Sequence, residues 1–223
     1  MIWSAFKVSL LVVASATVVT SVLGLALAFV LARREFRGRE LLDAVLTMPL
    51  VLPPTVTGYY LIVLLGRRGL LGAPLYRLTG WTITFTWQAA ALAATVVALP
   101  LMIKAARAAI ESVEPKFELA SYTLGKGELE TFLRVTLPLA RRGVVAGIVL
   151  SAARALGEFV ATLMIAGNIP GKTQTMPLAI YEAVISGDDR RAQTLAVLLT
   201  LISVAAIYLT NKLSRAPRGT YFT

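Results

Sequence analysis

The sequence of 223 residues contains neither cysteine nor histidine. These absences exclude disulfides, thiolate nucleophiles, imidazole metal ligands and histidine proton relays. Charged residues make up only 15 % of the chain, against about 25 % in soluble domains. Among them we find no nucleophile–base pair, no phosphate-cradling glycine loop and no metal-binding cluster. We therefore expect no catalytic residue, no metal site and no cofactor bound by this chain.

Hydrophobic residues, in contrast, make up 57 % of the sequence, and the mean hydropathy is +0.75. They form five long runs, at 8–32, 44–66, 81–103, about 143–166 and 192–210. The first three contain no charge, and each exceeds the roughly 20 residues that a helix needs to cross a bilayer. The sequence therefore predicts an all-α, polytopic membrane protein with about five transmembrane helices.

The distribution of Lys and Arg predicts the orientation. The polar segments 33–43 and 104–142, with the tail after residue 210, hold fourteen of the 22 basic residues, against seven on the other side. Because cytoplasmic loops carry the excess of positive charge, we expect the N-terminus outside and the C-terminus in the cytoplasm. The net charge of +10 then reflects basic residues at the membrane ends of the spanning segments, and we do not expect nucleic acid as a partner.

Two irregular stretches interrupt this pattern. Pro53, Pro54 and Thr55 lie in the second run and predict a broken helix, since a proline pair removes two backbone donors. The break either lines a polar pathway or is a kink that serves helix packing. Residues 173–186 are apolar but too short to span, and they predict a short helix at the outer interface.

A polar segment, "ELASYTLGKGELETFLRVTLPLA" (118–140), separates the third and fourth runs. Gly125 predicts a turn between two short helices, and Leu129, Phe132 and Leu133 share one face of the second. Leu137-Pro138 is expected to end that helix. Such a segment is either an interfacial helix held by lipid headgroups or a contact for a cytosolic protein.

The same segment resembles the cytoplasmic loop of ABC importer permeases. In that loop a Glu-Ala-Ala motif precedes a glycine by three residues, and Ile-x-Leu-Pro follows nine residues later. Counting from Gly125 leads to Val135 and then to Leu137-Pro138, whereas the Glu-Ala-Ala positions hold Leu119, Ala120 and Ser121. Glu118 lies one residue before the motif's glutamate position.

Further segments resemble one branch of this family, the permeases of molybdate, tungstate and sulfate importers. They are "PLVLPPTVTGYYL" (49–61), "GRRGLLG" (66–72), "ARALGEF" (153–159) and "GNIPGKTQTMPLAIYEAV" (167–184). The resemblance covers nearly the full length, and the molybdate permeases are the most similar. It implies one membrane domain over 1–223 with the type I ABC importer permease (MetI-like) fold, in a bacterial or archaeal inner membrane.

The resemblance also implies partners. Members work as a pair of permease subunits in the lipid bilayer, with a cytosolic ABC ATPase dimer that binds ATP and Mg and an external oxyanion-binding protein. This chain would be a transport subunit rather than an enzyme, joined to the ATPase by a coupling loop at about 111–140. The coupling residues implied are Glu118, Ala120, Gly125, Leu129, Phe132, Leu137 and Pro138.

Candidates for the translocation pathway or gate are Pro53, Pro54, Thr55, Arg154 and Glu158. Arg154 and Glu158 are four residues apart near the middle of the fourth run and are expected on one helix face. Either Arg154 attracts the oxyanion, or the two charges neutralise each other and lock helices or a gate; we favour the lock.

Three other hypotheses remain open at this point. The substrate could be tungstate or sulfate/thiosulfate instead of molybdate, since both kinds of anion are tetrahedral dianions. The chain could be a secondary transporter or channel, although these typically show inverted repeats and we find none. It could also be a membrane-anchored scaffold, which would need neither the helix break nor the intramembrane charges.

Overall fold

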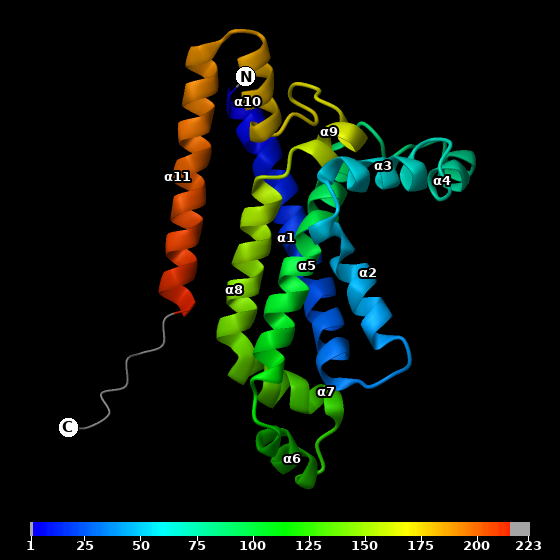
Figure 1. The fold of residues 1–223 in the computed structure, drawn as a ribbon, viewed down its shortest axis with the longest axis vertical. Helices are drawn as coiled ribbons and strands as arrows, with labels where there is room; N and C mark the ends of the chain where they lie inside the picture. Colours follow the sequence, from blue (N-terminus) through cyan, green and yellow to red (C-terminus); the bar gives the residue numbers. More distant parts are fainter. Residues whose placement is uncertain (1, 215–223) are drawn as a thin grey trace, which may run out of the picture.

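The computed structural model describes residues 2–214, and every regular element in that range is helical (Figure 1). The prediction of an all-α chain is confirmed. The elements are α1 (Ile2–Arg33), α2 (Arg39–Val51), α3 (Pro54–Leu65), α4 (Gly72–Thr79), α5 (Trp87–Glu111), α6 (Pro115–Thr123), α7 (Glu128–Thr131), the π-helical η1 (Phe132–Thr136), α8 (Leu137–Leu156), α9 (Val160–Ala166), α10 (Met176–Ile185) and α11 (Asp189–Ser214). Residues 215–223, which carry part of the predicted orientation, lie outside the described range.

Helix α5 forms the centre of the bundle and packs against both α1 and α8. Its sequence is rich in alanine, and the alanines between Ala89 and Ala98 are buried. Small side chains let helix backbones approach closely, which is how helices associate where lipid tails compete for apolar contacts. The approach is close at Gly143 of α8, where an added Cβ would lie 2.5 Å from the Cβ of Ala109.

The number of spans agrees with the prediction of about five. Among the described residues, four helices are long and apolar enough to cross a membrane, and the count is five when α2 and α3, bent by 115° at their break, are taken as one span. The predicted break at Pro53 and Pro54 is therefore confirmed. The third span begins later than predicted, at Trp87, because Thr86 caps α5 by accepting a hydrogen bond from the Ala89 N–H, 3.2 Å away.

The fourth apolar run does not form one helix, contrary to the expectation for 143–166. Helix α8 ends at Leu156, and α9 begins only at Val160. The chain between them leaves the helical path, and Glu158 in this gap caps the start of α9. Hydropathy alone does not reveal this interruption, because the residues on both sides of it are apolar.

The two ends of the bundle differ in what they carry (Figure 1). Helices α6 and α7 project from one end, here named the loop end. The N-terminus, α9 and α10 lie toward the opposite end, here named the far end. The predicted short helix within 173–186 is α10, whose Met176 and Ala179 are buried with Ala5 of α1 and Leu195 of α11.

Candidate functional site

The predicted glycine turn of the loop is present between α6 and α7. Gly125 has φ +77°, a left-handed conformation that other residues rarely adopt. Its N–H donates to the carbonyl of Tyr122 (2.9 Å), and the N–H of Lys126 donates to that of Ser121 (3.2 Å). These two bonds form a Schellman motif, which closes the C-terminus of α6. The hydroxyls of Ser121 and Thr131, 2.8 Å apart and buried, then join α6 to α7.

Leu137-Pro138 does not end the second helix, so that prediction is wrong. Residues Phe132–Thr136 form a π-helical turn that leads directly into α8. The Leu137 N–H donates to the carbonyl of Phe132, five residues earlier, and Pro138 falls in the first turn of α8. The π-helical turn directly before Pro138 departs from the regular i→i−4 hydrogen bonding, and a proline, which cannot donate, is accommodated at such a departure.

The predicted apolar face of the second helix is divided between two environments. Leu129 is 68 % exposed and Leu133 is also exposed. Phe132, however, is only 7 % exposed, and its ring centroid lies 4.4 Å from that of Phe29 in α1. Phe132 therefore anchors the loop to the bundle, and the prediction that it faces outward with Leu129 is wrong.

Glu118 faces inward, although it comes from an exposed helix. Its carboxylate accepts bonds from the guanidinium of Arg33 (Nε 3.1 Å, Nη2 2.9 Å) and from the hydroxyl of Thr136 (2.6 Å). Arg33 also donates to the carbonyl of Ile110 at 2.9 Å. Arg33, at the end of α1, thus binds both the end of α5 and Glu118 of α6. Glu118 in turn binds Thr136 of the π-helical turn. We name Arg33, Glu118 and Thr136 the Arg33 clamp.

The outward surface of the loop is apolar. Phe117, Leu119, Tyr122 and Leu124 project from α6 and its turn, and Leu124 is 78 % exposed. Of the three remaining candidates, Ala120 and Pro138 are also exposed, whereas Leu137 is half-buried. We did not predict Phe117, Tyr122 and Leu124 as contact residues. The sequence of α6 has no amphipathic pattern, so it does not indicate that these side chains face outward while Glu118 faces inward.

At the break of the second span, the chain is extended at Leu52 and Pro53, and α3 begins at Pro54. The carbonyl of Pro53 accepts bonds from the N–H groups of Val56 (2.9 Å) and Thr57 (3.2 Å). Pro53, Pro54 and Thr55 are exposed in this chain. The break therefore carries polar backbone on an accessible part of the spanning region.

Helix α3 then packs closely against α9. An added Cβ on Gly58 would lie 2.8 Å from the sulfur of Met164 and 3.1 Å from the Cα of Ala161. The hydroxyl of Thr57, beside Gly58, is buried and has no hydrogen-bond partner. The structure thus brings the broken span next to α9, the helix that Glu158 caps.

Arg154 and Glu158 do form an ion pair, but they do not share a helix. Arg154 lies in the last turn of α8, and its Nη1 is 3.0 Å from Oε2 of Glu158 in the gap before α9. Oε1 of Glu158 accepts the N–H of Ala161 at 2.9 Å. The Glu158 side chain is 2 % exposed and that of Arg154 is 30 % exposed. Both oxygens of the buried carboxylate are therefore engaged, and the pair holds α8 and α9 together.

Comparison with known proteins identifies the family. Residues 20–217 match the family described as "Binding-protein-dependent transport system inner membrane component". The chain belongs to this family of inner-membrane permeases. It is 42 % identical to the molybdenum transport system permease protein ModB of Escherichia coli (strain K12) over 217 residues, which cover 97 % of this chain and 95 % of that protein. It is 38 % identical to the sulfate transport system permease protein CysW of Synechococcus elongatus, covering 92 % and 71 %.

The fold is also that of ABC importer permeases. A solved chain of the MetNI methionine ABC transporter superposes with a TM-score of 0.69 at 17 % identity, covering 96 % of this permease and 93 % of that chain. At this identity the likeness concerns the fold alone. Family and fold together establish a multi-pass inner-membrane permease.

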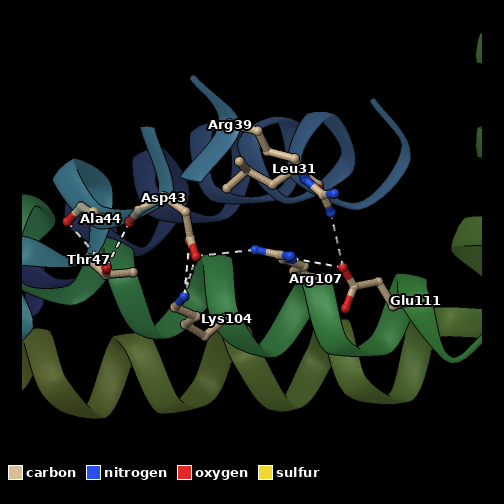
Figure 2. Close-up of polar contacts among 8 residues, drawn as sticks. All are labelled: Leu31, Arg39, Asp43, Ala44, Thr47, Lys104, Arg107 and Glu111. Carbon is tan, nitrogen blue, oxygen red and sulfur yellow. Dashed lines mark hydrogen bonds and ion pairs between the residues drawn. The ribbon is translucent and has the colours of Figure 1, made fainter. Parts of the chain in front are cut away.

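A second polar cluster of this permease was missed by the sequence analysis. Asp43 of α2 accepts bonds from Lys104 Nζ (2.8 and 3.0 Å) and Arg107 Nη1 (3.3 Å) of α5 (Figure 2). Arg107 Nε also donates to Glu111 at 2.8 Å, and Glu111 lies 3.7 Å from Arg39. We name these five residues the Asp43 network. Asp43 and Lys104 are 61 positions apart, so no local pattern indicates their pairing.

Proposed function

We propose that this chain is the membrane-spanning permease subunit of an ATP-driven ABC importer that carries molybdate into the cytoplasm. The observation that supports this most strongly is the 42 % identity to a molybdenum permease over nearly the whole of both chains. The proposed assembly contains a second copy of this chain, a cytosolic ATPase dimer and an external oxyanion-binding protein. ATP and Mg would bind to the ATPase, and this chain would contribute no catalytic residue.

The loop at 111–140 is the proposed contact with the ATPase. Its outward side chains Phe117, Leu119, Tyr122, Leu124 and Leu129 offer an apolar surface that fits a helix-in-groove contact. The glycine turn, the Arg33 clamp and the buried Phe132 hold this surface rigidly on the bundle. Rigidity is required because closure of the ATPase pair must move the helices of the permease instead of bending the loop.

In the same proposal the loop end faces the cytoplasm and the N-terminus lies outside, as the distribution of Lys and Arg favours. The native chain has no cysteine, so a single introduced cysteine is labelled without background. Leu124→Cys should react with a membrane-impermeant maleimide only from the cytoplasmic side, and Lys172→Cys, at an exposed position between α9 and α10, only from the outside. The reverse pattern would overturn the orientation and leave the family assignment intact.

The gate is proposed to lie where α3 meets α9, with Pro53, Pro54 and Thr55 on the pathway side. The Arg154–Glu158 pair supports a lock more than an anion site, because Glu158 cancels much of the field of Arg154. Transport needs weak contacts along the pathway, since a tight site would trap the ion. Exposed backbone at a helix break offers contacts of that kind.

Sulfate is the second candidate substrate, because the chain is also 38 % identical to a sulfate permease. The deciding experiment is ATP hydrolysis by liposomes that hold this chain, its cognate ATPase and its binding protein, titrated with molybdate, tungstate and sulfate. We expect molybdate to stimulate hydrolysis at the lowest concentration. Leu124→Asp should abolish the stimulation, and Leu124→Met should retain it. An ATPase that neither associates nor responds to any of the three oxyanions would contradict the proposal and favour a secondary transporter.

A further inference from the structure

Helix α2 is attached to the bundle differently from the other spanning helices. None of its 13 residues is buried, and no α2 residue belongs to the described core clusters. Most of its apolar side chains, such as Val51 at 84 % exposure, are exposed, and Leu42, Leu46 and Pro49 are only half-buried. Apolar packing within this chain therefore does little to fix its position.

The Asp43 network supplies the attachment that apolar packing does not. Asp43 is held by two cations of α5, and Glu111 at the end of α5 is held by Arg107 and faces Arg39 at the start of α2 (Figure 2). Arg39 Nε also donates to the carbonyl of Leu31 at 2.9 Å. The hydrogen bonds within these ion pairs are directional, so they keep α2 at a defined height along α5, which apolar contacts alone would not do.

The network also occupies a mechanical position. Glu111 is the last residue of α5, and α6 of the loop begins four residues later at Pro115. Helix α2 starts after Gly38, which has φ +91°, and it ends at the break before Pro54. It is thus a helix about 20 Å long, at about 1.5 Å per residue, between the left-handed Gly38 and the proline break, with Pro49 in its last turn.

We infer that the Asp43 network passes movement of the coupling loop to the broken span. When the end of α5 moves with the loop, Lys104, Arg107 and Glu111 would carry α2 with it and shift the break at Pro53. The five residues act as positioning residues for the gate and touch no substrate. This inference rests on the proposed importer function. It predicts that loss of the network uncouples ATP hydrolysis from transport, while the permease and the ATPase remain assembled.

The experiment uses spin labels on single cysteines in the assembled complex, where each label pairs with its copy in the second permease subunit. Ser112→Cys, in the exposed segment between α5 and α6, reports movement of the loop. Val51→Cys reports movement of the last residue of α2, next to the break at Pro53. Distances are measured with and without trapped nucleotide, together with anion-stimulated ATPase and oxyanion uptake. With Asp43 intact, both distances should change on nucleotide trapping.

In Asp43→Asn we expect the change at Ser112→Cys to persist and the change at Val51→Cys to fall at least twofold. Uptake should drop about tenfold per ATP hydrolysed. Lys104→Gln should show the same pattern more weakly, because Arg107 still holds Asp43. Asp43→Glu should restore the Val51→Cys change, and Glu40→Gln, an exposed α2 carboxylate outside the network, should behave as wild type.

A full change at Val51→Cys in both Asp43→Asn and Lys104→Gln would overturn the inference. So would normal uptake per ATP in both variants. A different result is possible with Asp43 intact: neither label responds to nucleotide and no ATPase assembles. That result would contradict the proposed importer function itself, and it is distinguishable from failure of the network alone. Loss of assembly in Asp43→Asn alone, with wild-type coupling in Lys104→Gln, would show that the network is only a structural anchor.

Discussion

The loop end of this permease and its α8–α9 junction are held together in different ways. At the loop end, ion pairs such as Arg33–Glu118 and Lys104–Asp43 join different helices and are partly exposed, and Arg34, just after α1, pairs with Glu128 of α7. Toward the far end, α3 and α9 meet through Gly58, and Glu158 is buried with both oxygens engaged. Each partly exposed ion pair adds little to stability by itself, whereas a buried pair is costly to break. The loop end is thus held by several individually weak contacts that act together, and the α8–α9 junction by one that is costly to break.

The largest expected effect is at the α8–α9 junction. Glu158→Ala leaves the buried N–H of Ala161 without an acceptor and Arg154, 30 % exposed, without its partner, so the free energy of unfolding should fall by about 3–4 kcal/mol. Thermal unfolding of the detergent-solubilised chain measures this loss. The double variant Arg154→Met/Glu158→Gln should recover much of it, because it leaves no charge unpaired. If Glu158→Ala is as stable as the wild type, the junction is not held by this pair.

The next effect concerns the apolar anchor of the loop end. Phe132→Ala should cost about 3 kcal/mol, because it empties the space beside Phe29. Leu133→Ala, the exposed neighbour, should change the free energy of unfolding by about 0.5 kcal/mol or less. Thermal unfolding of the two variants compares the loss at the buried Phe132 with the loss at the exposed Leu133. Equal losses would mean that Phe132 faces outward, as the sequence pattern suggests.

A smaller effect is expected in the middle of the bundle. Gly143→Ala puts a Cβ against Ala109 and should cost about 1–3 kcal/mol through overpacking, offset by about 1 kcal/mol of helix propensity. The net loss of about 1 kcal/mol should appear as a lower melting temperature. Gly127→Ala is the control, since nothing lies within 4 Å of its added Cβ. A stabilised Gly143→Ala would show that α5 and α8 are farther apart than described.

The smallest effect is expected at the surface of the loop end. Arg34→Ala removes the pair with Glu128, in which both side chains are well exposed, and should cost less than about 1 kcal/mol. The loss should shrink further at high salt, because exposed charges are screened. Unfolding measured at low and high ionic strength tests this. A large, salt-independent loss would contradict the contrast between the loop end and the α8–α9 junction.

Several features of the candidate site were predictable from the sequence because they depend on neighbouring residues. The Gly125 turn and the break at Pro53 and Pro54 follow from backbone chemistry at one or two positions, and both are present. Other features were predicted wrongly for identifiable reasons. The continuation of the helix through Pro138 depends on a π-helical turn, and the side to which Phe132 points depends on Phe29, about a hundred residues away in sequence.

The sequence by itself determined the fold class, the approximate positions of the spanning segments and the resemblance to the permease family. Long apolar runs, glycine and proline act through local hydrogen bonding and transfer into lipid, so they can be read in order along the chain. Only the tertiary structure decided the partners of charges that lie far apart in sequence. Glu118 meets Arg33 across 85 positions and Asp43 meets Lys104 across 61. A charged side chain is satisfied by any opposite charge within reach, and only the packing of α1, α2 and α5 brings one particular partner there.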